Sequence, residues 1–299
     1  MRSVFEWNIG RRSLSLGKRT LIAGVVNVTP DSFSDGGLYL DPEQAVSHGL
    51  KLLDDGADII DIGGESTRPG AKVFSPTAPK NPALNSAVTE EEELRRVVPV
   101  ITALKKARPD CVISVDTYKA SVASKSVEAG ADIVNDVSGF RWDPRMVKTL
   151  AELKCGAILM HSRGRPDEWH AMKPSSDIVL QVKRDFRDWA DAALMAGVKR
   201  ERIALDPGFG FGKSYEENYP LLKRFEELHQ LRYPLAAGVS RKSFIGRAIA
   251  RNGKDARVDE RVYGTVAAET VAILKGAHII RTHDVKAAVD AARVADLAV

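Results

Sequence analysis

The stretch "GADIIDIGG", residues 56–64, places a glycine before a short β-branched run that ends in polar and small residues. The same order recurs in "GADIVNDVSG" at residues 130–139 and in "GAHIIRTHD" at residues 276–284. Glycine is common just after the end of a helix, and β-branched residues favour strands. Each stretch is therefore predicted to join the end of a helix to the start of a strand.

Outward from these joints, eight short apolar runs can be found along the chain. They cover residues 21–26, 58–62, 111–115, 132–134, 157–160, 202–205, 235–239 and 278–280. Between them lie stretches with helical spacing, such as 42–54, 90–106 and 177–195, where apolar residues recur three or four positions apart. Strand and helix are thus predicted to alternate eight times.

This alternation predicts the fold class. Nearly continuous apolar strands are typical of a parallel sheet covered on both faces, and eight strand–helix units close a TIM barrel of about 250 residues. We therefore predict an α/β fold with one domain over residues 1–299, in which 20–299 form a TIM (β/α)8 barrel. A doubly wound open sheet is the alternative. Residues 1–19 alternate weakly around Gly10 and are predicted to form an N-terminal β-hairpin over the strand-start end of the barrel.

Composition limits the classes of function. The 44 Lys and Arg residues are balanced by 40 Asp and Glu residues and are spread along the chain, so nucleic acid binding is not expected. No apolar run has the length of a membrane span, and no leader peptide opens the chain. The expected location is the cytoplasm, with no membrane partner. Cys111 and Cys155 open apolar runs and are expected to be reduced thiols.

In a barrel of this kind the loops after the strands converge on one face, which carries the functional side chains. The residues at the predicted strand ends are Asn27, Asp61, Gly63, Asp116, Asn135, Asp136, His161, Asp206, Ser240, Arg241, Arg281 and His283. One polar residue at a strand end is ordinary, because the chain leaves the core there. Polar residues at so many ends favour a shared binding site.

The residue types at these ends suggest what the site binds. Asp116, Asn135 and Asp206 offer oxygen acceptors to a flat heterocycle with N–H edges. Each hydrogen bond from a ring N–H to an ionised Asp contributes about 1.5 to 3 kcal/mol. Asn27 offers a neutral oxygen ligand to Mg²⁺, if phosphate supplies the charge. The loops after strands two, six, seven and eight add basic side chains, namely Arg68, Lys213, Lys242, Arg281 and His283, and cations in the last two loops of a barrel are typical of a phosphate site.

Other catalytic motifs are missing from the sequence. HExxH, paired CxxC, GxxxxGK[ST] and GxSxG do not occur. The stretch "GFGFGK", residues 208–213, lacks the spacing of a dinucleotide-binding loop and is interpreted as a flexible glycine loop. His161 is interpreted as a structural residue at a strand end rather than as a catalyst.

Seven motifs, taken together, resemble one known family over nearly the whole chain. They are "GVVNVTPDSFSDGG" (24–37), "DIGGESTRPGA" (61–71), "SVDTYK" (114–119), "NDVSG" (135–139), "LDPGFGFGK" (205–213), "VSRKSFIG" (239–246) and "GAHIIRTHDV" (276–285). They look like the motifs of dihydropteroate synthase, and the first two are highly specific. The resemblance implies a TIM barrel that joins 6-hydroxymethyl-7,8-dihydropterin diphosphate to 4-aminobenzoate, making dihydropteroate and pyrophosphate in folate synthesis.

The same resemblance implies a role for each matching residue. The pterin would be held by Asp116, Asn135, Asp206 and Lys242. The diphosphate would be bound by Asn27, Thr67, Arg68, Arg281 and His283, with Asn27 as the ligand of a Mg²⁺ cofactor. The aminobenzoate pocket, where sulfonamides compete in this family, would consist of Phe33, Thr67, Pro69, Phe211 and Ser243. The catalytic residues would be Asp35, Arg68 and Lys242.

The chemistry implied by the resemblance needs no nucleophilic side chain. Mg²⁺ and the basic residues neutralise charge on the departing pyrophosphate, and the arylamine attacks the remaining pterin methylene cation. Asp35 stabilises that cation, while residues 30–37 close over the site as a lid and exclude water. A homodimer through the outer helices is also implied.

Two alternatives stay open. A pterin-dependent methyltransferase that serves a corrinoid protein has a similar barrel and pterin pocket, and a pterin-binding protein without activity is the second. The "SRKS" loop, the pair Arg281 and His283, and the lid motif favour the synthase, because they suit pyrophosphate and an arylamine. Residues 69–89 form a longer, proline-rich loop than is usual for the family, which leaves the closing of the lid open.

Overall fold

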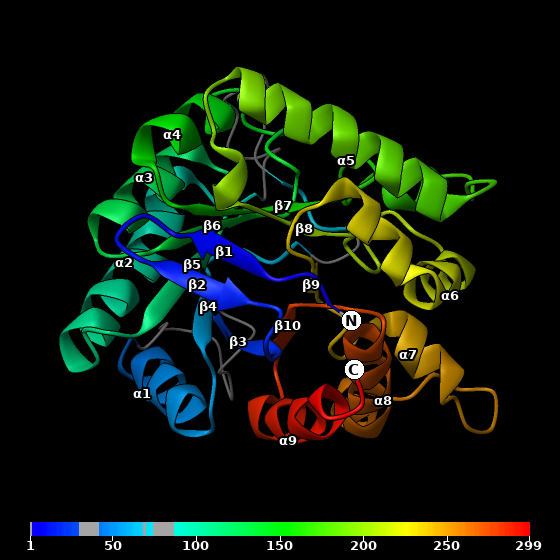
Figure 1. Ribbon diagram of the computed structural model, residues 1–299. Helices are drawn as coiled ribbons and strands as arrows, with labels where there is room; N and C mark the ends of the chain where they lie inside the picture. Colours follow the sequence, from blue (N-terminus) through cyan, green and yellow to red (C-terminus); the bar gives the residue numbers. More distant parts are fainter. Residues whose placement is uncertain (1, 30–41, 68–69, 74–86) are drawn as a thin grey trace.

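The computed structural model describes residues 2–29, 42–67, 70–73 and 87–299 (Figure 1). Within them, an eight-stranded parallel sheet runs in the order β8-β7-β6-β5-β4-β3-β10-β9. Its strands are β3 (Leu21–Asn27), β4 (Ile59–Gly63), β5 (Val112–Asp116), β6 (Ile133–Asp136), β7 (Gly156–Met160), β8 (Ile203–Asp206), β9 (Ala236–Ala237) and β10 (Ile279–Thr282).

The two ends of this sheet meet. Leu205 of β8 pairs in parallel with Leu235, just before β9, and the Leu205 N–H donates to the Pro234 carbonyl at 2.9 Å. The sheet is therefore a TIM barrel, as predicted, and the alternative of an open doubly wound sheet is wrong. All strands of a parallel barrel end at one mouth, which brings the candidate residues to the same face.

Helices surround the barrel (Figure 1). They are α1 (Pro42–Asp54), α2 (Glu90–Ala107), α3 (Ala120–Glu128), α4 (Met146–Leu153), α5 (Ile178–Met195), α6 (Tyr215–Lys223), α7 (Ser243–Ala248), α8 (Val262–Leu274) and α9 (Val285–Asp296). Three of them start at side chains that accept from free backbone N–H groups, namely Thr89, Asp177 and Ser214. Among the described residues, no helix is both long and apolar enough to span a bilayer.

The predicted joints between helix and strand are confirmed. Gly56, Gly130 and Gly276 each follow a helix with φ of 103°, 119° and 95°, a left-handed conformation that glycine adopts without steric cost. The predicted runs agree with the strands to within a few residues, except at 235–239, where β9 contains only Ala236 and Ala237. Alanine and the following Gly238 have low strand propensity, and the chain turns towards α7 there.

The predicted N-terminal hairpin is also confirmed. Strands β1 (Phe5–Asn8) and β2 (Ser13–Leu16) pair antiparallel, and Trp7, Ile9 and Leu16 are buried. They pack against residues at the starts of the barrel strands, among them Leu21 and Ile59. The hairpin therefore covers the end of the barrel opposite to the candidate site.

Trp7 tests this role. Its side chain is fully buried, and its Nε1–H donates to the Arg202 carbonyl at 2.8 Å. We expect Trp7→Ala to lower the free energy of unfolding in urea by about 3 to 5 kcal/mol, because it leaves a cavity and an unpaired carbonyl. Val4→Ala, at a side chain 59% exposed in the same segment, is the control and should change it little. Equal losses of stability in the two variants would contradict the conclusion that the hairpin packs against the end of the barrel through Trp7.

Candidate functional site

The floor of the site is an ion-pair bridge across three barrel strands. From β10, the Arg281 Nε donates to Asp61 Oδ2 of β4 at 2.5 Å, and its Nη2 donates to Asp116 Oδ2 of β5 at 2.7 Å. The Asn135 side chain of β6 donates to Asp61 Oδ2 at 3.3 Å. Burial raises the pKa of Asp116, a shift that Arg281 opposes and Asp61 reinforces. Four predicted strand-end residues are thus joined in one network.

Glycines leave room above this network. A methyl group on Gly63 would lie 3.5 Å from Asp116 Cβ and 3.8 Å from Asn27 Oδ1. A methyl group on Gly238 would lie 3.6 Å from Asp206 Oδ2 and 3.8 Å from the Arg281 Cβ. These short distances place Asn27 and Asp206 beside Asp116 and Arg281. The four residues line one hollow at the strand ends, which we call the bowl. The expectation that these strand ends meet at one mouth is confirmed.

Asp206 is the second buried carboxylate of the bowl. It ends β8, is 4% exposed, and its Oδ1 accepts from the Gly208 N–H at 2.7 Å. Burial raises its pKa to about 6, against the opposing effects of that hydrogen bond and of the nearby cations Arg281, Lys242 and Lys213. The carboxylate is ionised at neutral pH, yet it is poorly solvated. A ligand N–H would replace the missing water.

A basic rim stands beside the bowl, built by the loops after β9 and β10. His283 Nδ1 lies 3.0 Å from Ser240 Oγ, and that same oxygen accepts the His283 N–H at 3.1 Å. Burial lowers the pKa of His283 to about 3, and Arg281, Arg241 and Lys242 lower it further. Neighbouring cations disfavour the charged imidazole, so His283 adds a neutral donor or acceptor to a rim whose charge comes from Arg281 and Lys242. Arg241 itself pairs with Asp284 at 2.6 Å.

An aromatic wall faces the rim. The Lys242 Nζ lies 4.2 Å from the centroid of the Phe211 ring, and Trp169 packs edge-on against the same ring at 5.3 Å. Ser243, the first residue of α7, is exposed beside Lys242. Trp169 was not predicted from the sequence, because its stretch "PDEWH" belongs to no motif and to no periodic element. Its contact with Phe211 appears only when the β7–α5 loop folds back.

The loop after β4 is described over residues 64–67, 70–73 and 87–89. Thr67 is half-buried at the start of this loop, and Glu65 just before it pairs with the fully buried Lys119 at 2.7 Å. Lys119 also pairs with the buried Glu93 of α2. These contacts fix where the loop leaves the barrel. Four predicted site residues lie outside the described residues, namely Phe33, Asp35, Arg68 and Pro69.

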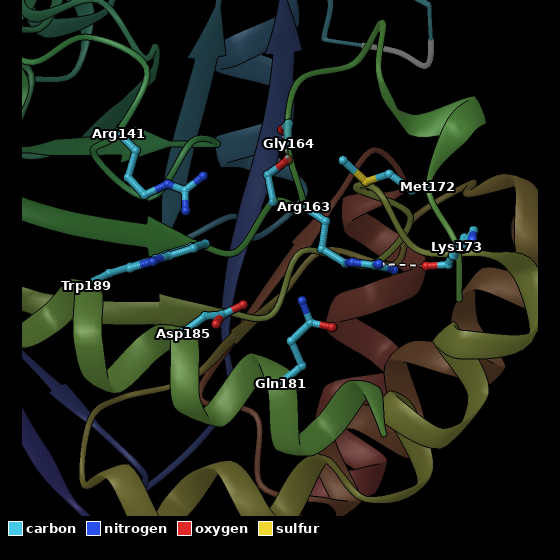
Figure 2. A pocket seen from close by; sticks show the side chains of 9 residues that line it. Arg141, Arg163, Gly164, Met172, Lys173, Gln181, Asp185 and Trp189 are labelled. Carbon is cyan, nitrogen blue, oxygen red and sulfur yellow. Dashed lines mark hydrogen bonds between the residues drawn. The ribbon is translucent and has the colours of Figure 1, made fainter. Parts of the chain in front are cut away.

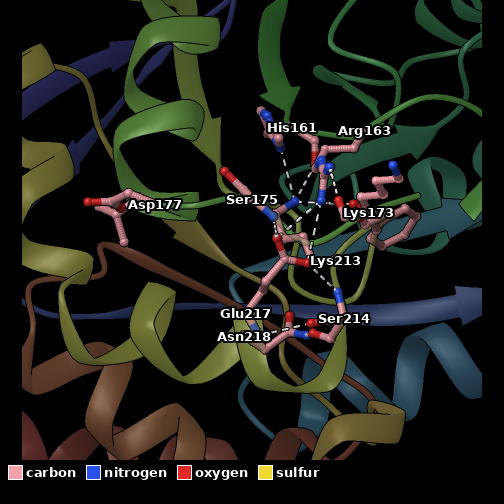
Figure 3. Close-up of polar contacts among 12 residues, drawn as sticks. His161, Arg163, Lys173, Ser175, Asp177, Lys213, Ser214, Glu217 and Asn218 are labelled. Atoms are coloured by element: carbon pink, nitrogen blue, oxygen red, sulfur yellow. Dashed lines mark hydrogen bonds and ion pairs between the residues drawn. The ribbon is translucent and has the colours of Figure 1, made fainter.

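Lys213 does not stand in the basic rim, which corrects its assignment to the phosphate site. Its Nζ is turned inward and contacts His161 Nδ1 at 3.0 Å and the Gly208 carbonyl at 2.8 Å (Figure 3). The interpretation of residues 208–213 as a flexible glycine loop is wrong as well. A methyl group on Gly208 would lie 2.0 Å from the His161 carbonyl oxygen, so the loop is pressed against β7.

A cavity of about 370 Å³, which shares no lining residue with the bowl, lies between α5 and the β7–α5 loop (Figure 2). Its lining includes Arg141, Arg163, Lys173, Gln181, Asp185 and Trp189, none of which was predicted as a site residue. The Arg141 guanidinium covers the Trp189 ring at 4.2 Å. The cavity is therefore distinct from the bowl at the strand ends.

A metal ion at this site would need oxygen ligands from a bound substrate in addition to those of the protein. In the described part of the chain, no three His, Cys, Asp or Glu side chains converge as a metal site. Asn27, which ends β3, has an amide oxygen close to Asp116 across Gly63. One neutral oxygen fits Mg²⁺ only where a phosphate and water complete the shell.

Comparisons with known proteins agree on one family. Residues 23–283 match the family described as "Pterin binding enzyme". The curated dihydropteroate synthase of Clostridium beijerinckii is 42% identical over 292 residues, which cover 97% of this chain and 98% of that protein. A solved structure of Xanthomonas albilineans dihydropteroate synthase with 4-aminobenzoic acid superposes with a TM-score of 0.86 at 41% identity, covering 99% and 98% of the two chains. A second, of the same enzyme in complex with 7,8-dihydropteroate, gives 0.80 at 40% identity, covering 95% of each chain.

The burial of Asp206 has a measurable cost. An acid that titrates near 6 in place of its usual 3.8 destabilises the fold by about 3 kcal/mol once it is ionised. Because the folded pKa is the higher one, this cost is absent below pH 4 and fully present above pH 6. We expect Asp206→Asn to stabilise the ligand-free protein by up to about that amount at pH 7.5, and by nothing at pH 3.5.

Unfolding in urea at several pH values measures this difference. Asp188→Asn, at an exposed position of α5, is the matched control and should leave stability unchanged across the range. A substitution at Asp206 that destabilises the protein equally at all pH values would contradict the raised pKa.

Proposed function

The chain belongs to the dihydropteroate synthase family of pterin-binding enzymes, and on this basis we propose which residues carry each part of the reaction. The protein is a transferase that condenses 6-hydroxymethyl-7,8-dihydropterin diphosphate with 4-aminobenzoate to give 7,8-dihydropteroate and pyrophosphate. The observation that supports the assignment best is the bowl itself. Two carboxylates with raised pKa values, the half-buried Asp116 and the buried Asp206, stand at its centre, next to a basic rim and an aromatic wall.

The pterin ring takes the centre of the bowl. Asp206 and Asp116 accept its N–H groups, and Asn135 can both donate and accept at the ring edge. Lys242 completes this set from the start of α7. Both carboxylates are buried enough that a hydrogen bond from the ring recovers solvation lost on folding, which makes recognition of N–H edges strong.

The diphosphate takes the basic rim. The Nε and Nη2 of Arg281 are held by Asp61 and Asp116, while its Nη1 has no hydrogen-bond partner among the described residues. We assign the hydroxyl of Ser240 as the donor to His283 Nδ1, which leaves the proton of the neutral ring on Nε2 as a donor to the diphosphate. Thr67, and Arg68 outside the described residues, are assigned to the diphosphate by their motif.

The aminobenzoate takes the aromatic wall. Phe211 supplies the face of the pocket, and Ser243 and Thr67 stand at its edges. Phe33 and Pro69 complete it from the two loops that lie outside the described residues. The related Xanthomonas albilineans structure with 4-aminobenzoic acid supports a second-substrate pocket in this fold.

Mg²⁺ fits this arrangement through Asn27. The amide oxygen would hold the ion together with diphosphate oxygens, and the bound ion would neutralise charge on the leaving pyrophosphate. Lys242, Arg68 and Arg281 stabilise the same charge directly, which favours cleavage of the C–O bond. Asp35 then stabilises the pterin methylene cation until the arylamine nitrogen attacks it. No side chain forms a covalent intermediate.

One assay tests the function. Purified protein is incubated with the pterin diphosphate, 4-aminobenzoate and Mg²⁺, and pyrophosphate release is followed. We expect release that requires both substrates and stops when the metal is chelated. A corrinoid methyltransferase or a silent pterin binder would release no pyrophosphate, and either result would overturn the proposal.

A substitution at Arg281 tests whether the diphosphate and the pterin ring are bound by different residues. We expect Arg281→Ala to weaken binding of the pterin diphosphate by at least about tenfold more than binding of the free hydroxymethylpterin, because a charge-assisted hydrogen bond is lost. Calorimetry with the two ligands measures the ratio. Arg257→Ala, at an exposed arginine, is the control. Equal losses for both ligands would contradict a role at the diphosphate.

We also propose a homodimer in the cytoplasm. On α8 the exposed side chains Tyr263, Val271 and Leu274 are 89%, 38% and 48% accessible and follow one another along one face of the helix. An apolar stripe of this kind is typical of a surface that a partner covers. We expect Val271→Asp to convert a dimer into a monomer in sedimentation. Met195→Asp, at an exposed residue of α5, should leave the dimer intact. A monomeric wild-type protein would contradict the proposal.

A further inference from the structure

Behind the glycine loop lies a row of three buried or half-buried ionisable side chains that the reaction described above does not use. Lys213 Nζ contacts His161 Nδ1 at 3.0 Å, and His161 Nε2 contacts Asp185 Oδ2 at 3.1 Å. Lys213 is 8% exposed, His161 is not exposed at all, and the Asp185 side chain is 21% exposed. Figure 3 shows Lys213 and His161 among the polar contacts between the β7–α5 loop and residues 213–218.

The proton positions in this row follow from its geometry. Lys213 has three hydrogens to donate and faces only acceptors: His161 Nδ1 and the carbonyls of Gly208, Phe211 and His161, at 2.8 to 3.3 Å. With Lys213 as an ammonium, His161 Nδ1 is the acceptor, and the ring proton sits on Nε2, from which it donates to Asp185. Below about pH 7, where Lys213 carries its charge, the row is an ammonium, a neutral imidazole and a carboxylate. Burial lowers the pKa of His161 to about 3, and Lys213 adds to this effect, which agrees with the neutral ring.

The imidazole is fixed in orientation as well as in protonation. Its ring stacks on Trp189 at 5.1 Å and meets the edge of Phe186 at 5.8 Å. Both aromatic residues lie on α5, where Phe186 directly follows Asp185 and Trp189 lies one turn beyond it. Helix α5 therefore holds the ring by packing and by a hydrogen bond at once.

The inner end of the row is attached to the pterin carboxylate. The Gly208 carbonyl accepts from Lys213 at 2.8 Å, and the Gly208 N–H donates to Asp206 Oδ1 at 2.7 Å. Residue 208 is held in a left-handed turn with φ of 63°, a conformation that a side chain would make impossible against the His161 carbonyl. Fixing the carbonyl of this residue fixes the amide that orients Asp206.

The positive charge of Lys213 also favours the ionised form of Asp206. The groups that lower the pKa of Asp206 are the Gly208 N–H and the cations Arg281 on β10, Lys242 before α7, and Lys213. Burial lowers the pKa of Lys213 itself to about 7, a shift that Asp206 and Glu217 oppose and that Arg163 and Lys242 reinforce. Arg281 and Lys242 are proposed to bind the substrate, whereas Lys213 contacts protein acceptors only. It is the cation whose effect on Asp206 is independent of the diphosphate.

We propose that Lys213, His161 and Asp185 are positioning residues that orient Asp206 through Gly208 and keep its carboxylate ionised for the pterin ring. This inference rests on the proposed function, because it takes Asp206 as the acceptor of the ring N–H groups. Asp185 lines the cavity beside α5, so the outer end of the row is open to solvent (Figure 2). The row thereby connects the surface of α5 with the centre of the bowl.

Lys213→Met tests the inner end. We expect the Kd for the pterin diphosphate at pH 7 to rise at least about tenfold, because the charge-assisted hydrogen bonds from Lys213 to His161 and to the Gly208 carbonyl are lost. Pterin binding should weaken at low pH as Asp206 becomes protonated, and we call this part of the pH profile the acid limb. We also expect the midpoint of this limb to rise by about one pH unit, because Asp206 loses a neighbouring cation. Lys199→Met, at an exposed lysine, is the matched control and should keep both values. Wild-type affinity, or a loss of affinity without a shift of the limb, would overturn the inference.

Variants at the other two positions keep the test decisive if Lys213→Met does not fold. His161→Asn retains an acceptor for Lys213, whereas His161→Leu does not, so the first should bind the pterin diphosphate more tightly than the second by about tenfold. Asp185→Asn should stay within about twofold of the wild type, and Asp185→Leu should not. Asp188→Leu is the control on the same helix. Equal affinities within either pair would contradict the row.

One measurement separates this inference from the proposed function. The ¹⁵N shifts of His161 in the ligand-free protein should report the neutral Nε2–H form from pH 5 to pH 8. A wild-type protein that shows this form but binds no pterin would overturn the proposed function and leave the row in place. A protonated or Nδ1–H imidazole would overturn the row, whatever the protein binds.

Discussion

The bridge that Arg281 makes to Asp61 and Asp116 is the interaction on which the site depends. It joins β10 to β4 and β5 at the mouth of the barrel, across the intervening strand β3. The bridge holds Asp116, one of the two carboxylates proposed to receive the ring, and it fixes the guanidinium proposed to bind the diphosphate. An arginine suits this position because its planar fork binds two carboxylates and still offers a third nitrogen to an anion.

Without a ligand, the ionised carboxylates of the bowl lower the stability of the protein. Burial raises the pKa of both Asp116 and Asp206, so their ionised forms cost free energy until a ligand donates to them. The cations around them reduce this cost without removing it. Stability and binding are therefore opposed at these positions, which is common where a site is built before its ligand arrives. The hairpin plug around Trp7, at the far end of the barrel, contributes stability without touching the site.

Much of the fold and part of the site could be predicted from the sequence. The repeated glycine, β-branched run and polar end fixed the strands and their order, because local conformation alone sets that pattern. The meeting of Asn27, Asp116, Asn135, Asp206 and Arg281 followed from barrel topology. Lys213 could not be placed, because a lysine after a strand looks the same whether it faces solvent or turns under a glycine loop. Trp169 could not be found either, since its contact with Phe211 depends on how the β7–α5 loop folds back.

The most direct test of this account is a crystal structure of the protein with the pterin diphosphate bound. The account predicts the ring in the bowl, with its N–H groups within hydrogen-bond distance of Asp206 and Asp116, and the diphosphate against Arg281 and His283. A ring bound in the cavity beside α5, or one that leaves Asp206 without a ligand contact, would contradict it.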